Sequence, residues 1–337
     1  MSNLDEENVA GNELSPEDIK AIIHPIGVMN GIMKADPEKC KHCGLCVTNC
    51  PMKCWEMDKD RVPMMKKEYT CFSCFNCMIA CPEGAVSVEQ TFSVRGGFFD
   101  TDFPPVRPPL EPRDGQGNPA SWTEMERTIM ERRSVRNFRK DPVSPHLIRR
   151  ILEAGRFAPS AANAQPWKFT VITDPGFHDE LENACQMFWA NMAPAFQNDE
   201  AAMGLYKQLP AAVFDPRVQR GIACVAKKEL PVFMNAPVII IVGSNTRMSF
   251  PELHAGICGQ NMNLAAMALG LGAVWCNFGT ALNFIPELKL KLGFPDPLWV
   301  IQTTLCIGYP SFKQQGTVAR HSRPVTWFGP GAEGEEQ

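Results

Sequence analysis

The sequence has no long hydrophobic run. The longest apolar stretch in its 337 residues lies around residues 238–242 and is far too short to cross a bilayer. It also has no excess of basic residues, since 33 Lys and Arg stand against 37 Asp and Glu, and no basic stripe suggests nucleic acid as a ligand. The first residues are acidic and lack the apolar segment of a secretion signal. These absences favour a cytoplasmic protein without a membrane span or a nucleic-acid partner.

Cysteine, by contrast, is abundant and unevenly placed. Nine of the 14 cysteines fall between Cys40 and Cys81, and eight of these form two copies of the spacing C-x2-C-x2-C-x3-C-P. This is the spacing of bacterial two-cluster ferredoxins, in which each run gives three thiolates to one [4Fe–4S] cluster and its fourth to the other. The expected ligand sets are Cys40, Cys43, Cys46 and Cys81 for one cluster, and Cys71, Cys74, Cys77 and Cys50 for the second.

Other uses of these cysteines fit the spacing poorly. Structural zinc needs four ligands per ion, usually as two separated pairs, and a disulfide framework needs an oxidising compartment and a secretion signal. Cys54 lies outside both runs and is interpreted as a small core residue. The scattered downstream cysteines are interpreted as core residues too, and they are Cys185, Cys224, Cys258, Cys276 and Cys306. Because exposed clusters are sensitive to oxygen, an anaerobic setting is expected.

The length suggests at least two domains. We expect an N-terminal extension over residues 1–30, a ferredoxin-like domain over 31–92, a Pro/Gly-rich linker over 93–120, and a second domain over 121–337. The linker contains FPPVRPPLEPRDGQGNP, and two interpretations stand: a disordered tether, or a semi-rigid spacer that packs the ferredoxin module against its electron acceptor. The spacer is favoured because proline lowers the entropy cost of a fixed placement.

The second domain mixes helices and strands without regular βαβ alternation, which indicates an α+β fold. A capping box of Ser121 and Glu124 predicts one helix, Ser144-Pro145 predicts another, and Ser15-Pro16 predicts a short one in the extension. Short β-branched or apolar runs predict strands, and small apolar residues predict a further helix in the second domain. These strands are expected at 169–173, 237–242 and 298–307, and the helix at 256–271.

Three segments of this domain carry candidate chemistry. Residues 132–136 read RRSVR, whose guanidiniums can bind a phosphate, although a basic helix end that complements the helix dipole is the structural alternative. Residues 158–167 read APSAANAQPW, where small side chains let the backbone approach a flat ligand. Residues 256–279 read GICGQNMNLAAMALGLGAVWCNFG.

In this order, RRSVRNF, APSAANAQPW, GQNMNLAAMALGLGAVW and the closing GYP…RHSRP resemble the nitroreductase family of FMN flavoenzymes, over roughly residues 121–328. With the cysteine runs in front, the chain resembles ferredoxin-fused nitroreductase-like proteins of anaerobes. The resemblance implies an α+β fold with a mixed sheet flanked by helices, preceded by a small ferredoxin-like domain. It also implies a homodimer with one FMN in each of two clefts at the subunit interface.

The resemblance further implies which residues bind FMN. The RRSVR motif would hold the ribityl phosphate and the pyrimidine edge, the APSAAN loop would approach FMN from the partner subunit, and the Asn-Phe pair after the last quoted helix motif would face flavin N5. Many relatives have Glu-Gly in place of that pair. Near the C-terminus His321 and Arg323 align with a family Lys-x-Arg, and Arg323 is the better phosphate ligand. The implied residues are Arg132, Arg133, Ser134, Arg136, Pro159, Ser160, Ala161, Asn163, Gln260, Asn277, Phe278, Arg320 and Arg323.

The implied reaction is carried by the flavin, without a catalytic residue from the protein. We expect electrons from a low-potential donor, such as a ferredoxin, to pass through the two clusters to FMN, which then reduces a nitroaromatic, a quinone or a related small compound. Gly270-x-Gly272 lacks the third glycine of a nicotinamide fingerprint and is better explained as a helix C-cap. Direct reduction of FMN by NAD(P)H stays open.

Three alternatives remain at this point. The same scaffold serves reductive dehalogenases and ene-reductases, and an FMN and iron–sulfur protein can also relay electrons to a partner protein without catalysis of its own. Aromatic residues between positions 176 and 232 suggest a lid over a planar substrate, but aromatics at helical spacing are more often part of the core.

Overall fold

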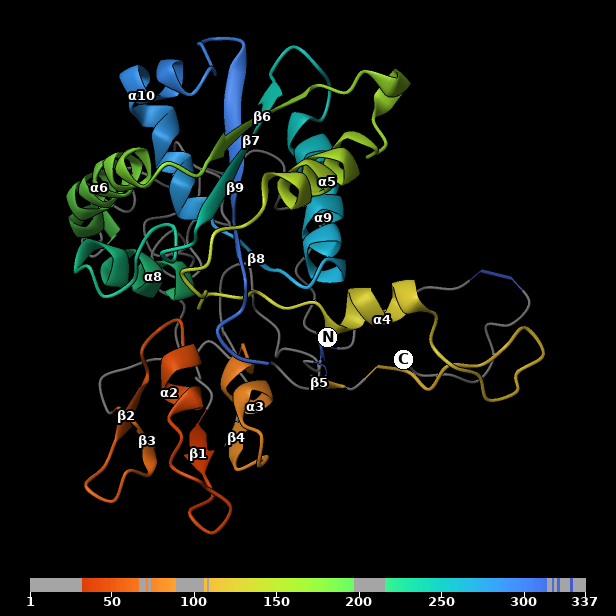
Figure 1. Ribbon diagram of the computed structural model, residues 1–337, viewed down its shortest axis with the longest axis vertical. Coiled ribbons are helices and arrows are strands. Elements are labelled where there is room, and N and C mark those ends of the chain that lie inside the picture. Colours follow the sequence, from red (N-terminus) through yellow and green to blue (C-terminus); the bar gives the residue numbers. More distant parts are fainter. Residues whose placement is uncertain are drawn as a thin grey trace, which may run out of the picture.

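The computed structural model describes residues 32–66, 71, 74–88, 106–107, 109–196, 216–313, 317, 320–321 and 328–329 (Figure 1). The helix predicted at Ser15-Pro16 and the predicted phosphate ligand Arg323 lie outside these residues.

The N-terminal module consists of two copies of one unit. Its helices α2 (Leu45–Asn49) and α3 (Asn76–Ala80) each follow a residue with left-handed backbone and each end at an extended fourth cysteine, Cys50 or Cys81. The strands pair antiparallel, β1 (Met33–Ala35) with β4 (Val86–Val88) and β2 (Trp55–Met57) with β3 (Pro63–Met65). Because the last strand of the module pairs with the first, the two cysteine runs are brought together.

The second domain is built on a four-stranded sheet. Its order is β6 (Trp167–Ile172), β7 (Val238–Asn245), β9 (Trp299–Gly308) and β8 (Gly272–Trp275), and each neighbouring pair is antiparallel. A single parallel bridge joins Ser134 to Ala273 at the β8 edge, so within the described residues the parallel pairing of the expected mixed sheet is confined to this point. The RRSVR motif is thereby fixed to the sheet.

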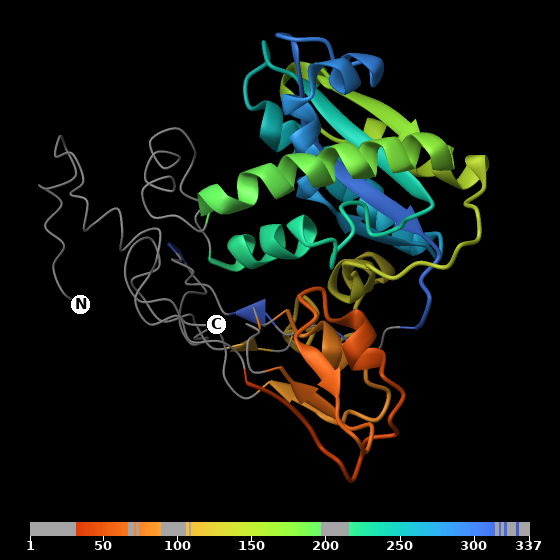
Figure 2. The same cartoon turned by 90° about the vertical axis from the view of Figure 1, so that its left-hand side faces the viewer.

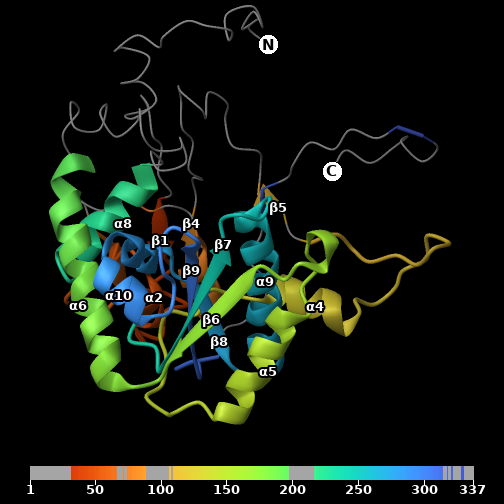
Figure 3. The same cartoon turned by 90° about the horizontal axis from the view of Figure 1, so that it is seen from above.

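Helices cover both faces of this sheet, as Figure 3 shows from above. One layer contains α5 (Pro145–Arg156) and α9 (Pro251–Ala268), and the other contains α6 (Pro175–Met192) and α8 (Pro216–Ala226). Strand β7 explains the arrangement, because Ile240 and Val242 pack into the core on the first side whereas Ile239 and Ile241 pack into the core on the second. A strand buried on both faces reads as a continuous apolar run.

Shorter elements complete the described chain. After β8 come η6 (Asn277–Phe284) and α10 (Pro286–Lys291), and η3 (Ala161–Asn163) and η4 (Ala193–Phe196) are single 3₁₀ turns. Strand β5 (Val106–Arg107) in the linker pairs antiparallel with β10 (Arg320–His321) near the C-terminus.

The helix starts differ from prediction at two places. The capping box is formed by Thr123 and Glu126 rather than by Ser121 and Glu124, and it opens α4 (Glu124–Glu131). The observed pair places Glu124 inside the first turn, where its charge complements the helix dipole. Helix α9 begins five residues before the predicted position 256, because Pro251 supplies a favourable first helical residue.

Two other helix predictions are confirmed. The Ser144 hydroxyl caps α5 by accepting a hydrogen bond from His146 N (3.3 Å), with Pro145 at the first helical position. Gly270, at φ +75°, ends the turn after α9, where Leu271 N donates to Ala266 O (2.9 Å). This geometry is that of a helix C-cap and explains the glycine without a nucleotide.

The two modules pack directly against each other, with the N-terminal module below α8 in Figure 2. One hydrophobic core contains Cys50 and Met52 of the first module together with Phe233 and Met234 of the second. Asn137 Nδ2 also donates to Thr48 O (3.2 Å) and to Asn49 Oδ1 (3.4 Å). A fixed placement of this kind is what the spacer interpretation of the linker requires, although residues 89–105 themselves lie outside the described chain.

Replacing Gly272 with alanine is expected to lower the free energy of unfolding by about 1–3 kcal/mol, the usual cost of overpacking. A Cβ at this position would lie 2.6 Å from the Val135 side chain, which holds the RRSVR segment against β8. Gly256→Ala in α9 is the matched control: its Cβ would meet nothing within 4 Å, so it should be neutral or stabilise by up to about 1 kcal/mol. Urea midpoints of the two variants test this, and equal midpoints would contradict it.

Candidate functional site

Seven of the eight cysteines are brought together in the way that the crossed pattern expects. Cys50, Cys71, Cys74 and Cys77 line one cavity in the N-terminal module. For the other set, burial raises the pKa of Cys46 to about 11, and the nearby thiolates of Cys81 and Cys43 act in the same direction. Cys50 therefore lies with the first three cysteines of the other run, and Cys81 lies near Cys46, as does Cys43.

These sets suit clusters better than single ions. Within the described part of the chain, no group of three or more His, Cys, Asp or Glu side chains is placed to hold a single metal ion. A tetrahedral zinc site with Zn–S bonds of about 2.3 Å requires sulfurs about 3.8 Å apart. A [4Fe–4S] cluster holds its four thiolates further apart, because each one binds a different iron atom.

Backbone amides support the cysteine sulfurs at equivalent positions of the two runs. Cys50 Sγ accepts a hydrogen bond from Cys54 N, and Cys81 Sγ accepts one from Ala85 N, both at 3.3 Å. Cys54 is 1% exposed and thus a core residue, as expected. Its thiol also contacts Cys50, and the hydrogen bond between them is the main cause that lowers the pKa of Cys50 to about 6.

Replacing Cys54 with alanine should leave the iron content unchanged, because the equivalent position already carries alanine at Ala85. The variant should lower the potential of the cluster bound to Cys50, since hydrogen bonds to the sulfurs favour the reduced, more negative cluster. Iron analysis and a redox titration check both points. A loss of iron would instead make Cys54 a ligand.

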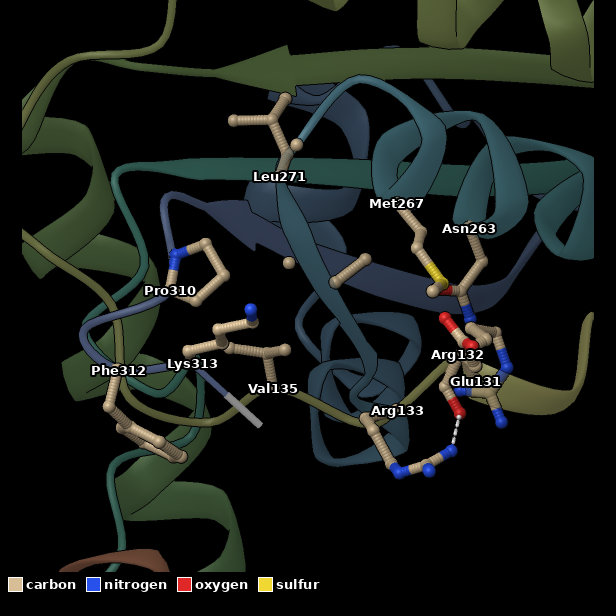
Figure 4. A pocket seen from close by; sticks show the side chains of 13 residues that line it. Glu131, Arg132, Arg133, Val135, Asn263, Met267, Leu271, Pro310, Phe312 and Lys313 are labelled. Atoms are coloured by element: carbon tan, nitrogen blue, oxygen red, sulfur yellow. Dashed lines mark hydrogen bonds between the residues drawn. The ribbon is translucent and has the colours of Figure 1, made fainter. Parts of the chain in front are cut away.

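The RRSVR segment is extended and divides its arginines between two cavities. Val135 N donates to Ala273 O (3.1 Å), so the segment runs along the β8 edge. Arg132 and Arg133 line a cavity of about 790 Å³ (Figure 4). Arg136 instead lines a second cavity, at the junction with the N-terminal module, together with Cys50.

The larger cavity contains a buried amide that lacks partners. Asn263 of α9 is 1% exposed, and its Nδ2 and Oδ1 have no hydrogen-bond partner. Figure 4 shows it beside Met267 and close to Arg132. An unsatisfied buried amide is costly unless a ligand or water completes its hydrogen bonds, so this cavity fits a polar cofactor. The sequence analysis chose Gln260, whereas α9 contributes Asn263 and Met267 to this lining.

The arginines around this cavity repel one another. Burial, together with the charges of Arg320 and Arg132, lowers the pKa of Arg133 to about 10. The pKa of Arg132 is lowered by burial, then by Arg320 and Arg136. A phosphate would relieve this repulsion. Arg133 in addition donates from Nη1 to Met130 O (2.9 Å) and Arg132 O (2.8 Å), so it serves the structural role of a basic helix end as well.

The loop expected to approach FMN from a partner subunit is largely exposed in this chain. Pro159, Ala161 and Asn163 are exposed, and Ser160 is half-buried. Ala161 N donates to Nε2 of the buried His254 (3.1 Å), which holds the loop on α9 and which the sequence analysis missed.

The segment expected near flavin N5 is held by its own hydrogen bonds. Asn277 Oδ1 accepts from Thr303 Oγ1 (2.9 Å), and Phe278 O accepts from Trp189 Nε1 (2.8 Å). The rings of Trp189 and Phe278 also pack edge to face at 5.6 Å, and Phe188 stacks on Phe284 at 5.2 Å. The core interpretation therefore holds for Phe188 and Trp189, while residues 197–215 of the suggested lid lie outside the described chain.

Comparisons with known proteins match the N-terminal module and the second domain to two different families. The model of the nitroreductase family matches residues 129–309, and that of the 4Fe–4S dicluster domain matches residues 39–85. No described helix is long and apolar enough to cross a membrane.

Three relatives illustrate the range of activities in the family. A 5,6-dimethylbenzimidazole synthase of Rhodospirillum rubrum is 46% identical, over 68% of this chain and 97% of the relative. An NADH dehydrogenase of Thermus thermophilus is 30% identical, over 54% and 84%, and a nitrobenzene nitroreductase of Ectopseudomonas oleovorans is 28% identical, over 51% and 81%. The chain belongs to the nitroreductase family of FMN oxidoreductases and carries a 4Fe–4S dicluster domain in front of it.

Proposed function

We propose that this protein takes electrons from a low-potential donor through two [4Fe–4S] clusters to FMN and delivers them to a small organic acceptor, either a nitroaromatic, a quinone or a related compound. The observation that carries the proposal is the junction cavity, where the cluster ligand Cys50 and the flavin-motif residue Arg136 share one lining. When bound, the clusters supply single electrons and the flavin supplies two-electron chemistry.

In this proposal the chain's own residues bind and orient the cofactors. Arg132 and Arg320 hold the FMN phosphate, with Arg323 as a further ligand from the C-terminal segment. The unpaired amide of Asn263 completes its hydrogen bonds on the cofactor. The exposed loop around Ser160 reaches the FMN of a second copy of the chain, which makes the working unit a homodimer.

The test begins with protein purified without oxygen and assayed for iron, sulfide and FMN. Reduction of the bound FMN is then followed with reduced ferredoxin, NADH or NADPH as the donor. Nitroaromatic, quinone, halogenated and enoate compounds follow as acceptors. The proposal expects fast reduction by ferredoxin and turnover of at least one acceptor class. Reduction by NADH at the same rate, independent of the clusters, would overturn the proposed electron route.

A second candidate function follows from the 46% identity to a 5,6-dimethylbenzimidazole synthase. The dimethylbenzene ring of that product is also a part of FMN, so the chain would consume its flavin rather than recycle it. The two functions are separated by incubating the protein, with its bound FMN reduced, with and without air and then analysing the flavin products by chromatography. The benzimidazole should appear for a synthase, whereas intact FMN should be recovered for a reductase.

A further inference from the structure

The two cysteine sets differ in exposure. In the first set Cys43 is exposed, Cys40 and Cys81 are partly exposed, and one cysteine, Cys46, is buried. In the second set Cys74 is partly exposed, and the other three, Cys50, Cys71 and Cys77, are buried. The first set therefore lies nearer the solvent, and the second lies nearer the interior of the molecule.

The junction with the flavin domain is formed at the end of α2, next to the second set. Besides Cys50 and Arg136, the cavity of about 270 Å³ at this junction is lined by Lys53, Phe138 and Met234. The two hydrogen bonds from Asn137 end on Thr48 and Asn49, which directly precede Cys50. The flavin domain thus contacts the N-terminal module directly beside Cys50, which is a ligand of the second set.

A packing contact continues from this point toward the segment expected at flavin N5. A Cβ placed on Gly221 of α8 would lie 3.0 Å from Phe278 Cζ and 3.7 Å from Met52 Cε. Met52 follows Cys50 by two residues and belongs to the same core. The side chains of Met52 and Phe278 therefore both lie next to this glycine.

The junction cavity also places a charge beside the second set, because the side chain of Arg136 shares the cavity lining with the ligand Cys50.

We propose that the cluster held by the second set is the one that passes electrons to FMN, and that Arg136 is the cation that lies between this cluster and the flavin. The cluster of the first set then faces the external donor. This inference rests on the proposed function, and it adds the order of the two clusters. With the cofactors bound, the outer cluster, reduced by the donor, would re-reduce the inner cluster after each one-electron transfer, so two electrons and two protons from water would reduce FMN fully. The inner set is Cys50, Cys71, Cys74 and Cys77.

The test is a redox titration of the full chain, purified without oxygen and monitored by electron paramagnetic resonance. Cys43→Ser and Cys74→Ser each alter one cluster's signal and thereby assign the two signals. Arg136→Gln should lower the midpoint potential of the inner signal by about 59 mV, which is a tenfold change in a one-electron equilibrium. It should leave the outer signal unchanged, and Arg136→Lys should restore most of the shift.

Arg150→Gln is the matched control, because it removes an exposed charge on α5 and should shift neither signal. A shift of the outer signal in Arg136→Gln, or no shift of either, overturns the inference. Should Arg136→Gln fail to fold, Asn137→Asp places a negative charge at the same junction and should lower the inner potential as well. The titration needs bound iron alone, so a chain that holds clusters but no FMN would refute the proposed function and still give this result.

Discussion

Replacing Cys74 with serine is expected to reduce bound iron from about eight atoms per chain, the content of two [4Fe–4S] clusters, to about four. The reason is that Cys74 lies in the cavity of one cysteine set and is not part of the other. Bound FMN should stay at its wild-type amount, because the arginines proposed to hold its phosphate line a separate cavity. Iron, sulfide and flavin analysis of anaerobically purified protein measures all three quantities.

Cys185→Ala is the matched control for this variant. Cys185 is fully buried in the second domain and belongs to neither run, so its loss should leave about eight iron atoms in place. Unchanged iron in Cys74→Ser would contradict the assignment of Cys74 as a ligand.

Replacing Arg132 with alanine should weaken FMN binding by about 10- to 100-fold. A hydrogen bond to a charged group contributes about 1.5–3 kcal/mol, and each 1.4 kcal/mol is about tenfold in affinity. Since the mutual repulsion of Arg132, Arg133 and Arg320 is relieved by an anion, part of the loss should disappear at high salt. Fluorescence titration of the flavin-free protein gives the dissociation constants.

Riboflavin supplies the control for the phosphate assignment, because it lacks the phosphate. Its affinity should be nearly the same for the wild type and Arg132→Ala, and Arg150→Ala, an exposed arginine on α5, should change neither ligand. An equal loss of riboflavin and FMN affinity in Arg132→Ala would mean that Arg132 contacts a part of the flavin other than the phosphate.

The features that the sequence predicted well depend on local chemistry. The cysteine spacing predicts the grouping of Cys50 with Cys71, Cys74 and Cys77, because the two runs are copies of one unit whose first and last strands pair. Ser144 and Pro145 define a helix start through their own hydroxyl and ring. The apolar run of β7 predicts a strand buried on both faces, because each face needs its own set of apolar side chains.

The features that could not be predicted depend on contacts between distant segments. Two overlapping S/T-x-x-E patterns compete before α4, and the sequence alone does not choose between them. Asn263 is one of several polar residues in an apolar helix. Only the folded structure shows that its amide has no hydrogen-bond partner and lies close to Arg132. The separation of Arg136 from Arg132 arises because the segment pairs with Ala273 and because the cluster module packs on one side of it.

The central claim is that electrons reach FMN through the cluster module. Its most direct test is the rate of FMN reduction by reduced ferredoxin, measured by stopped flow on wild-type protein and on Cys74→Ser with equal bound FMN. The account predicts rapid loss of the oxidised flavin absorbance in the wild type and almost none in the variant. Equal rates in the two proteins would mean that the donor reduces FMN directly, and would contradict the account.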